Sequence, residues 1–306
     1  MWKSLCAPAL LAALLPNPLL GQPARDGPLA FRPDGAQVAC GVGSDVRVWD
    51  AGTAQLRRIL TGHFAPVIAL AWSPDSQTLI SADADGHVSL WKNGEPPPRA
   101  LEGHPCAVFA VTFRPDSRAF LTCGQDRRVK IWRGGDGEWL HTFGPFDSPL
   151  YALAISPVDN RFATAGKDGL IRLCNGTTGE CPRVLTGHTD AVFALACSAD
   201  GKRLVSGGQD STLRVWDIDA GRESFRADGH RDPVHHVIFS ASGRRVASVG
   251  ASGQVVIWDA ASGLPLFSQR FPGSVGAIGF SPDGSQLAVA AGPERFLLLD
   301  LPQRAR

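Results

Sequence analysis

The chain has 306 residues, with 30 Lys and Arg against 29 Asp and Glu and a formal net charge of +1 at pH 7. This balance, together with the lack of any long Lys/Arg run, argues against a nucleic-acid-binding protein, because such proteins usually carry a basic excess. A hydrophobic content of 44% allows a full core, while 34 Gly and 23 Pro predict many short elements joined by tight turns.

The first residues have the features of a secretory signal peptide. A single early charge at Lys3 is followed by an uncharged apolar stretch over residues 5–15, and small residues follow Pro16 and Pro18. The apolar stretch is too short to cross a bilayer as a helix. We therefore expect residues 1–21 to be removed and the mature chain, residues 22–306, to be exported to the periplasm or secreted. The alternative is a cytoplasmic protein that keeps them.

The rest of the chain repeats itself with a period of about 42 residues. A short run of β-branched residues recurs seven times, and each copy ends in a residue that is aromatic in most copies. Successive end residues are 42, 41, 42, 42, 42 and 41 positions apart. Turns of the Ser-Pro-Asp type keep the same period. The seven closing residues are Trp49, Trp91, Trp132, Cys174, Trp216, Trp258 and Leu299.

Each repeat predicts a small antiparallel sheet. In residues 67–91, apolar residues alternate with small or polar ones in short runs broken by Pro-Asp and Asp-Gly. Such a sheet of about four strands cannot bury both faces alone, so neighbouring sheets must stack on one another. Seven repeats therefore predict an all-β, seven-bladed β-propeller.

At these positions the chain resembles the WD-repeat family, whose blades carry Gly-His before the first strand and Trp-Asp at the end of the third. The resemblance covers nearly all of the chain. The pairs that carry it are Gly62-His63, Gly103-His104, Gly187-His188, Gly229-His230, Trp49-Asp50, Trp216-Asp217 and Trp258-Asp259.

The resemblance also bears on the N-terminus. In the family, an N-terminal segment commonly supplies the outer strand of the last blade, and here only six residues follow Leu299-Asp300. Leu20-Gly21-Gln22 stands in the repeat where Thr61-Gly62-His63 stands, so residues 14–21 could be that strand. The closing strand is thus the alternative to the signal peptide for residues 1–21.

A His, a hydroxyl, an Asp and a Trp recur at fixed spacing in three repeats. One enzyme does not need three identical triads, so we expect a structural role. The resemblance implies that the four side chains form a hydrogen-bonded chain inside each blade. The three expected sets are His63, Ser81, Asp85 and Trp91; His104, Thr122, Asp126 and Trp132; and His188, Ser206, Asp210 and Trp216.

The other repeats depart from this pattern. The fourth has Phe146 and Cys174 in place of the His and the Trp, and the sixth has Ser252 in place of the Asp. The seventh has lost the set, and the first keeps only Trp49. We therefore expect the second, third and fifth blades to be the best supported.

The resemblance also implies a partner-binding rim at one mouth of the propeller channel. In the family, contact positions lie three and five residues after the blade His and one before the blade Asp. Four successive repeats carry a ring at one such position, which predicts an aromatic arc suited to side-chain anchors; the alternative is that these rings only cover the channel wall. The expected partner-binding residues are Arg25, Ile68, Phe109, Gln125, Tyr151, Lys167, Phe193, Gln209 and His235.

No motif for a metal or cofactor is present. The sequence contains no Cys-x-x-Cys pair and no glycine-rich phosphate loop ending in Lys-Ser/Thr. The only adjacent histidines, His235 and His236, would point to opposite faces of a strand. We expect neither a metal nor a cofactor.

Two cysteines of the fourth repeat lie opposite one another across a predicted hairpin turn. Cys174 and Cys181 are at equal offsets from the turn NGTTGE, which brings their Cβ atoms near disulfide range. A disulfide could form there, and export to an oxidising compartment would favour it. The alternative is two small side chains that fill the space left by the Trp.

These features predict a non-enzymatic scaffold, a monomer or a subunit of a complex, that binds a protein or peptide at the channel mouth. We expect no nucleic-acid partner and no integral membrane segment in the mature chain. The alternative is a small-ligand-binding or enzymatic propeller, since a fold does not fix a function.

Overall fold

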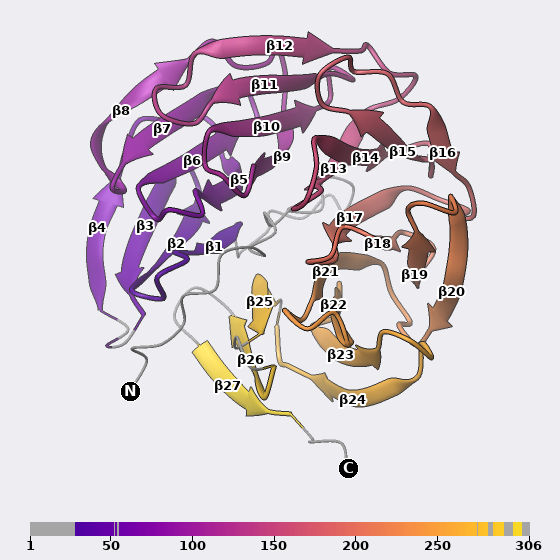
Figure 1. Ribbon diagram of the computed structural model, residues 1–306. Coiled ribbons are helices and arrows are strands. Elements are labelled where there is room, and N and C mark those ends of the chain that lie inside the picture. Colours follow the sequence, from indigo (N-terminus) through magenta and orange to yellow (C-terminus); the bar gives the residue numbers. More distant parts are fainter. Residues whose placement is uncertain are drawn as a thin grey trace. The chain divides into compact units, whose positions relative to one another are not determined.

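The computed structural model describes residues 28–51, 53, 55–273, 275–280, 284–290 and 296–301. Within these residues the chain is all-β, with no helix, and forms seven antiparallel sheets in chain order (Figure 1). The expected fold is confirmed: the protein is a seven-bladed β-propeller. The predicted signal peptide or closing strand, Arg25 and Pro293 lie outside the described residues.

The chain divides into two compact units, Met1–Leu153 and Ala154–Arg306. The boundary falls inside β13, the first strand of the fourth sheet, whereas the sequence pattern predicts one uninterrupted series of repeats. Each unit is described by itself below.

The first unit contains three complete sheets. Within each sheet the strands pair in chain order, from the first strand to the fourth. The strands of the first sheet are β1 (Leu29–Phe31), β2 (Gln37–Val42), β3 (Asp45–Asp50) and β4 (Leu56–Leu60); those of the second are β5 (Val67–Trp72), β6 (Thr78–Asp83), β7 (Val88–Lys92) and β8 (Glu95–Leu101); and those of the third are β9 (Val108–Phe113), β10 (Ala119–Gly124), β11 (Val129–Arg133) and β12 (Trp139–Phe143).

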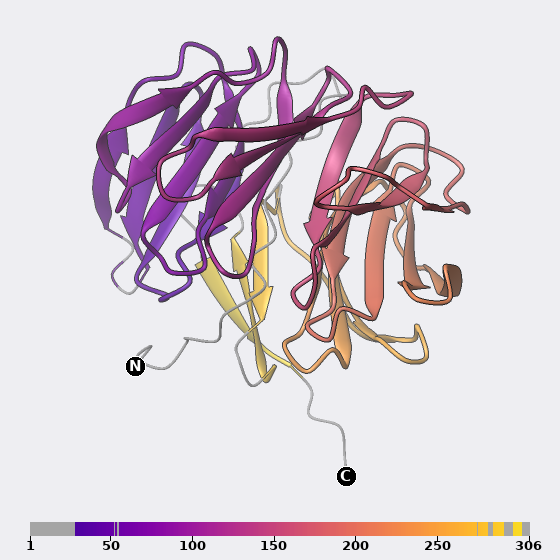
Figure 2. The same ribbon diagram turned by 45° about the horizontal axis from the view of Figure 1, so that its top comes forward.

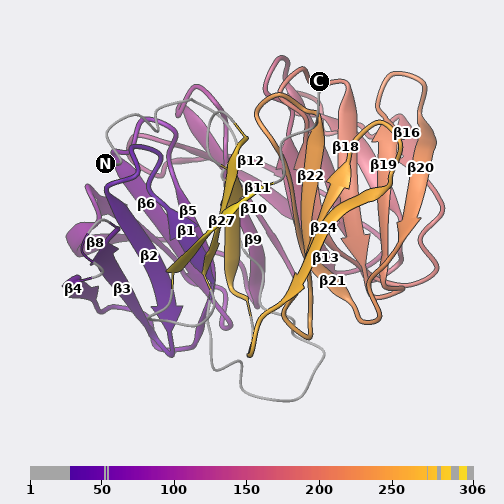
Figure 3. The ribbon, with the colours of Figure 1, turned by 90° about the horizontal axis from the view of Figure 1, so that it is seen from below.

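The fourth sheet begins at the boundary, and the second unit continues the series of sheets along the chain. Figure 3 shows strands of the second unit in salmon and orange. The strands of the fourth sheet are β13 (Leu150–Ile155), β14 (Arg161–Gly166), β15 (Ile171–Asn175) and β16 (Arg183–Leu185); those of the fifth are β17 (Val192–Cys197), β18 (Arg203–Gly208), β19 (Thr212–Asp217) and β20 (Arg222–Asp228); those of the sixth are β21 (Val234–Phe239), β22 (Arg245–Gly250), β23 (Gln254–Asp259) and β24 (Pro265–Arg270); and the described strands of the seventh are β25 (Ala277–Phe280), β26 (Gln286–Ala290) and β27 (Phe296–Asp300).

The core lies between neighbouring sheets, as the stacked sheets of the first unit show (Figure 2). Val67, Leu70 and Trp72 of the second sheet pack with residues of the first sheet, and Ala69 and Ala71 pack with residues of the third. Alternate residues of one strand thus face two different neighbours, as the period of a strand requires. The fourth strands are much more exposed than the inner ones.

Both faces of each inner strand are buried, which explains why the apolar runs are nearly continuous there. Val192–Cys197 is buried at every position, and so is Thr78–Asp83. The outermost strands are more polar because one face and one edge of each meet water. The second sheet ends in a strand with three prolines, Pro96, Pro97 and Pro98. Prolines donate no ladder hydrogen bonds, so they protect this edge from pairing with another strand.

Candidate interaction site

The expected hydrogen-bonded sets occur in the third and fifth blades. In the third blade, His104 Nδ1 lies 2.8 Å from Asp126 Oδ2 and His104 Nε2 lies 2.7 Å from Thr122 Oγ1. Trp132 Nε1 donates to the same hydroxyl at 2.9 Å. Each set ties the loop before the first strand to the second strand, the following turn and the third strand.

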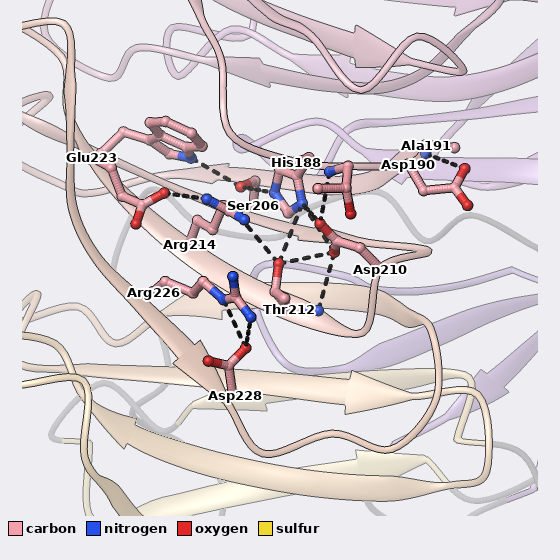
Figure 4. A network of polar contacts seen from close by, with 12 residues as sticks. His188, Asp190, Ala191, Ser206, Asp210, Thr212, Arg214, Glu223, Arg226 and Asp228 are labelled. Atoms are coloured by element: carbon pink, nitrogen blue, oxygen red, sulfur yellow. Dashed lines mark hydrogen bonds and ion pairs between the residues drawn. The ribbon is translucent and has the colours of Figure 1, made fainter.

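Figure 4 shows the equivalent set of the fifth blade. Ser206 Oγ accepts a hydrogen bond from Trp216 Nε1 at 2.9 Å and lies 2.7 Å from His188 Nε2. The indole N–H can only donate, so the serine oxygen accepts from it and the serine hydroxyl proton is free to point at His188 Nε2. The imidazole then carries its own proton on Nδ1 and donates it to Asp210 at 2.9 Å. The serine is fully buried and its hydroxyl is occupied, so it is not available as a nucleophile.

The electrostatics of this set favour an ionised carboxylate. Burial would raise the pKa of Asp210, but hydrogen bonds from His188, Thr212 and the Thr189 N–H together hold it well below its ordinary value. Thr212 and the half-buried Arg214–Glu223 pair extend the network toward the outer strand (Figure 4).

The second blade differs from the expected set at its acidic member. His63 Nδ1 lies 2.8 Å from Asp83 Oδ2, not from Asp85, while Ser81 and Trp91 make the expected contacts. Asp83 is fully buried, and Asp85 is exposed. The assignment of Asp85 to the hydrogen-bonded set is therefore wrong.

The physical reason is the side chain at the end of the second strand. The third and fifth blades have Gly124 and Gly208 there, and a Cβ built on Gly208 would stand 3.0 Å from His188 Nδ1 and 3.2 Å from Asp210 Oδ1. A side chain at this position points into the space between the two groups. In the second blade Asp83 occupies that space and bonds to the histidine, so the carboxylate two residues later is not needed.

The sixth blade keeps three members of the set. Ser248 Oγ lies 2.6 Å from His230 Nε2 and accepts from Trp258 Nε1 at 2.7 Å, but His230 Nδ1 has no partner in the described part of the chain. A Cβ on Gly250 would stand 2.2 Å from Asp232 Oδ1 and 2.8 Å from His230 Nδ1, so the carboxylate of the loop faces the histidine without bonding to it. Burial lowers the pKa of His230 to about 4, against the charge of Asp232.

The aromatic residues predicted to line a binding rim are buried. Phe109 is 7% exposed, Tyr151 5% and Phe193 2%, and Phe109 packs edge to face on Tyr151 with ring centroids 5.2 Å apart. Their expected role as exposed anchors is not what the structure shows, because they are packed against their surroundings.

The other predicted contact residues divide by exposure. Gln125 and Lys167 are exposed, while Ile68, Gln209 and His235 are half-buried. Burial lowers the pKa of His235, against the opposing effect of hydrogen bonding to the backbone of Val275 and Pro233.

Phe64 is an exposed aromatic side chain that the sequence argument missed. It is 89% exposed, although its neighbour His63 is buried. Its ring stands edge-on to His87, with centroids 6.4 Å apart. The sequence holds a signal for it: the residue directly after the blade His position is Phe64 here but Pro105, Asp147, Thr189, Arg231 and Pro272 in the following blades.

Phe64 belongs to a surface made at one end of the second and third sheets. Val67 pairs with Asp83 and Ala82 with Val88, so the loop before β5 and the turn between β6 and β7 meet at the same end. Gly86, with φ of +100°, lets this turn touch the next loop: His104 N donates to its carbonyl at 2.9 Å, and a Cβ would stand 2.1 Å from the His104 carbonyl oxygen. We call residues 62–66, 83–87, 102–107 and 124–128 the histidine-loop face.

The fourth blade contains the disulfide. Cys174 and Cys181 are bonded, with Cα atoms 3.9 Å apart. Four other blades shift the pairing of their third and fourth strands by one residue at the closing Trp, for example from Val215 with Phe225 to Trp216 with Glu223. The same shift brings Cys174 opposite Cys181, because Leu173 pairs with Arg183.

Among the described residues, no group of three or more His, Cys, Asp and Glu side chains is placed to hold a metal ion. The same residues contain no helix of the length and apolarity that a membrane crossing requires.

The repeated sheets with an internal His, hydroxyl, carboxylate and Trp define a β-propeller of the WD-repeat class. The pattern of the WD domain, G-beta repeat (WD40), matches residues 54–92, 95–133, 137–175, 179–217 and 222–259, more than half of the chain. The protein belongs to the WD40 repeat family.

Curated relatives match the chain over short segments. It is 39% identical to Coronin-7 of Mus musculus over 66 residues, 36% to the Intraflagellar transport protein 122 homolog of Danio rerio over 63, and 42% to Transcription initiation factor TFIID subunit 5 of Caenorhabditis elegans over 52. These segments make up 21%, 21% and 16% of the chain but only 7%, 5% and 8% of the relatives. The chain thus matches a small part of much longer proteins.

Proposed function

We propose that this chain is a non-enzymatic scaffold that binds a protein or peptide partner through the histidine-loop face of the first unit. Membership of a repeat family that includes a named subunit of a multi-subunit transcription factor supports a role in assembly. The finer assignment of the face rests on one observation, the 89% exposure of Phe64.

Phe64 suits a binding anchor because it is exposed yet held in place. His63 is tied to Asp83 and Ser81, and Pro66 O accepts from Ala84 N at 3.0 Å, so the loop on both sides of Phe64 is bonded to the sheet. A rigid aromatic ring gives up little conformational entropy on binding and buries a large area, and such residues dominate the energy of many interfaces.

The His, hydroxyl and carboxylate groups, which resemble a catalytic triad, support the same proposal. In the second, third and fifth blades the serine or threonine hydroxyl is fully buried and accepts from a tryptophan, while the histidine is bonded on both ring nitrogens. These groups hold the blades together and leave no activated nucleophile.

The test is capture of partners from the native host by the purified chain. We expect Phe64→Ala to lose at least about tenfold in recovery of its specific partners, since truncation of an anchor commonly costs about 2 kcal/mol or more. Leu264→Ala is the matched control, because Leu264 is also apolar and 64% exposed but lies between β23 and β24 of the second unit. Equal recovery by the folded Phe64→Ala variant and the parent would contradict the proposal.

A further inference from the structure

The second blade carries a carboxylate that its fold does not use. In the third and fifth blades the turn aspartates are occupied: Asp126 and Asp210 bond to their histidines, and their side chains are 5% and 6% exposed. In the second blade Asp83 does this work, accepting from His63 and from the backbone N–H groups of Asp85 and His87 at 3.0 and 2.9 Å. Asp85 is exposed, and only its N–H is bonded among the described residues.

The free carboxylate lies on the same surface as Phe64. Asp83 joins the two, because one of its oxygens bonds to His63, next to Phe64, and the other bonds to the backbone of Asp85. His87, two residues after Asp85, stands edge-on to the Phe64 ring. The loop of the exposed aromatic ring and the turn of the exposed carboxylate are thus both bonded to one buried residue, Asp83.

The segment that carries this pair has acidic side chains but no Lys or Arg. Between residues 59 and 91 the sequence has Asp75, Asp83 and Asp85 but no Lys or Arg. Glu102 is exposed beside Gly103, and the backbone of Gly103 lies against the turn at Gly86. The basic side chains at this face come from the third blade: Arg127 and Arg128 lie in its turn, and Lys130 Nζ donates to the Gly103 carbonyl.

We propose that Phe64 and Asp85 form a recognition site for a cationic side chain, Arg or Lys, of the bound partner; this inference rests on the proposed function. The aromatic ring attracts a cation through its quadrupole, and the carboxylate adds a charge-assisted hydrogen bond. A basic residue flanked by small or apolar ones fits this surface, whereas an acidic residue there would meet Asp85 and Glu102.

The test uses a short fluorescent peptide of alternating Arg and Ala, with a peptide of alternating Glu and Ala as its counterpart, at low ionic strength. We expect the basic peptide to bind and the acidic peptide not to bind. Phe64→Ala and Asp85→Asn should each raise the Kd of the basic peptide about fivefold, since exposed cation–π contacts and surface ion pairs are individually modest. Added salt should weaken binding to the parent more than to Asp85→Asn, because it screens the ion pair.

The matched control is Asp116→Asn. Asp116 is an exposed carboxylate in the turn between β9 and β10, at the other end of the third sheet, so the change removes the same charge away from the face. It should leave the Kd unchanged. Equal Kd values for the parent and the folded Asp85→Asn variant, or tighter binding of the acidic peptide, would overturn the inference.

The two proposals fail in different ways. If Phe64→Ala loses its partners while Asp85→Asn keeps both its partners and its affinity for the basic peptide, the face binds but does not select a cation. If both variants weaken the basic peptide while partner capture is unchanged, the cation site exists but does not serve the proposed scaffold function.

Discussion

At the residue scale, the second blade shows how a repeat can keep its hydrogen bonds while one member moves. The sequence spacing predicts Asp85 because it lies four residues after the serine, as Asp126 and Asp210 do. An aspartate at that spacing bonds to the histidine only when the residue midway between it and the hydroxyl residue is glycine. Asp83 fills the space that Gly124 and Gly208 leave open. Which aspartate bonds to the histidine therefore depends on which carboxylate occupies the space beside the imidazole, not on its position in the repeat.

The two aspartates of the second blade should contribute very differently to stability. Asp83→Ala should lower the free energy of unfolding by about 1–3 kcal/mol or more, because it leaves His63 and two backbone N–H groups without their acceptor. Asp85→Ala should change it by less than about 0.5 kcal/mol, as an exposed residue outside the network. Urea denaturation of both variants measures the difference. A larger loss for Asp85→Ala than for Asp83→Ala would contradict the assignment.

A second residue-scale feature is a histidine in an alanine position. His236 is 3% exposed, neither ring nitrogen has a partner in the described part of the chain, and the equivalent residues of earlier blades are Ala69, Ala110, Ala152 and Ala194. Burial, with the charge of His235 adding to it, lowers the pKa of His236 from 6.5 to about 3. The folded protein therefore holds this imidazole neutral.

The pH dependence follows from that shift. Below about pH 6.5 the unfolded chain binds a proton at His236 that the folded chain does not, so stability should fall as the pH falls toward 3, by up to about 1.4 kcal/mol per pH unit for each such histidine. His236→Ala should flatten the dependence between pH 7 and 5, as measured by denaturation midpoints, whereas His141→Ala, a change at an exposed histidine, should not. An unchanged slope in His236→Ala would refute the account.

At the element scale, the strands and their turns follow from the sequence pattern, and the details of pairing do not. The short, largely apolar runs and the repeated turns between them predict seven antiparallel sheets. The runs are nearly continuous in the inner strands because both faces of those strands are buried. The one-residue shift at the closing Trp of four blades is invisible in that pattern. In the fourth blade the equal offsets of Cys174 and Cys181 around the turn do predict that the two lie opposite one another, and the disulfide confirms it.

The disulfide should stabilise the fourth blade, which lacks the His and Trp of the complete sets. The double variant Cys174→Ser, Cys181→Ser should lose about 2 kcal/mol in the free energy of unfolding under oxidising conditions. The parent measured with a reductant should match the double variant measured without one. If the reductant leaves the parent's denaturation midpoint unchanged, the bond does not contribute to stability.

At the scale of the whole molecule, the repeat predicts the fold class better than it predicts the surface. Periodicity reports residues that recur because packing requires them, and the hydrogen-bonded sets are of this kind. Phe64 is the opposite case: it is informative because it does not recur. The family positions direct attention to Phe109, Tyr151 and Phe193, which the structure buries.

We propose that the chain is exported, because the features of residues 1–21 favour a signal peptide and a disulfide is best sustained in an oxidising compartment. N-terminal sequencing of the protein from its native host should find a start near Gln22 or Arg25. A start at Met1 or Trp2 would instead favour a retained N-terminal segment that closes the last blade.

The central claim is that partners bind the histidine-loop face of the second and third blades. Hydrogen–deuterium exchange of the chain with and without its captured partner tests it most directly, since amides covered by an interface exchange more slowly. We predict that protection on binding centres on residues 62–68 and 83–87 and extends to 102–107. Protection confined to the outer strands β4, β8 and β12, or to the second unit, would contradict the claim.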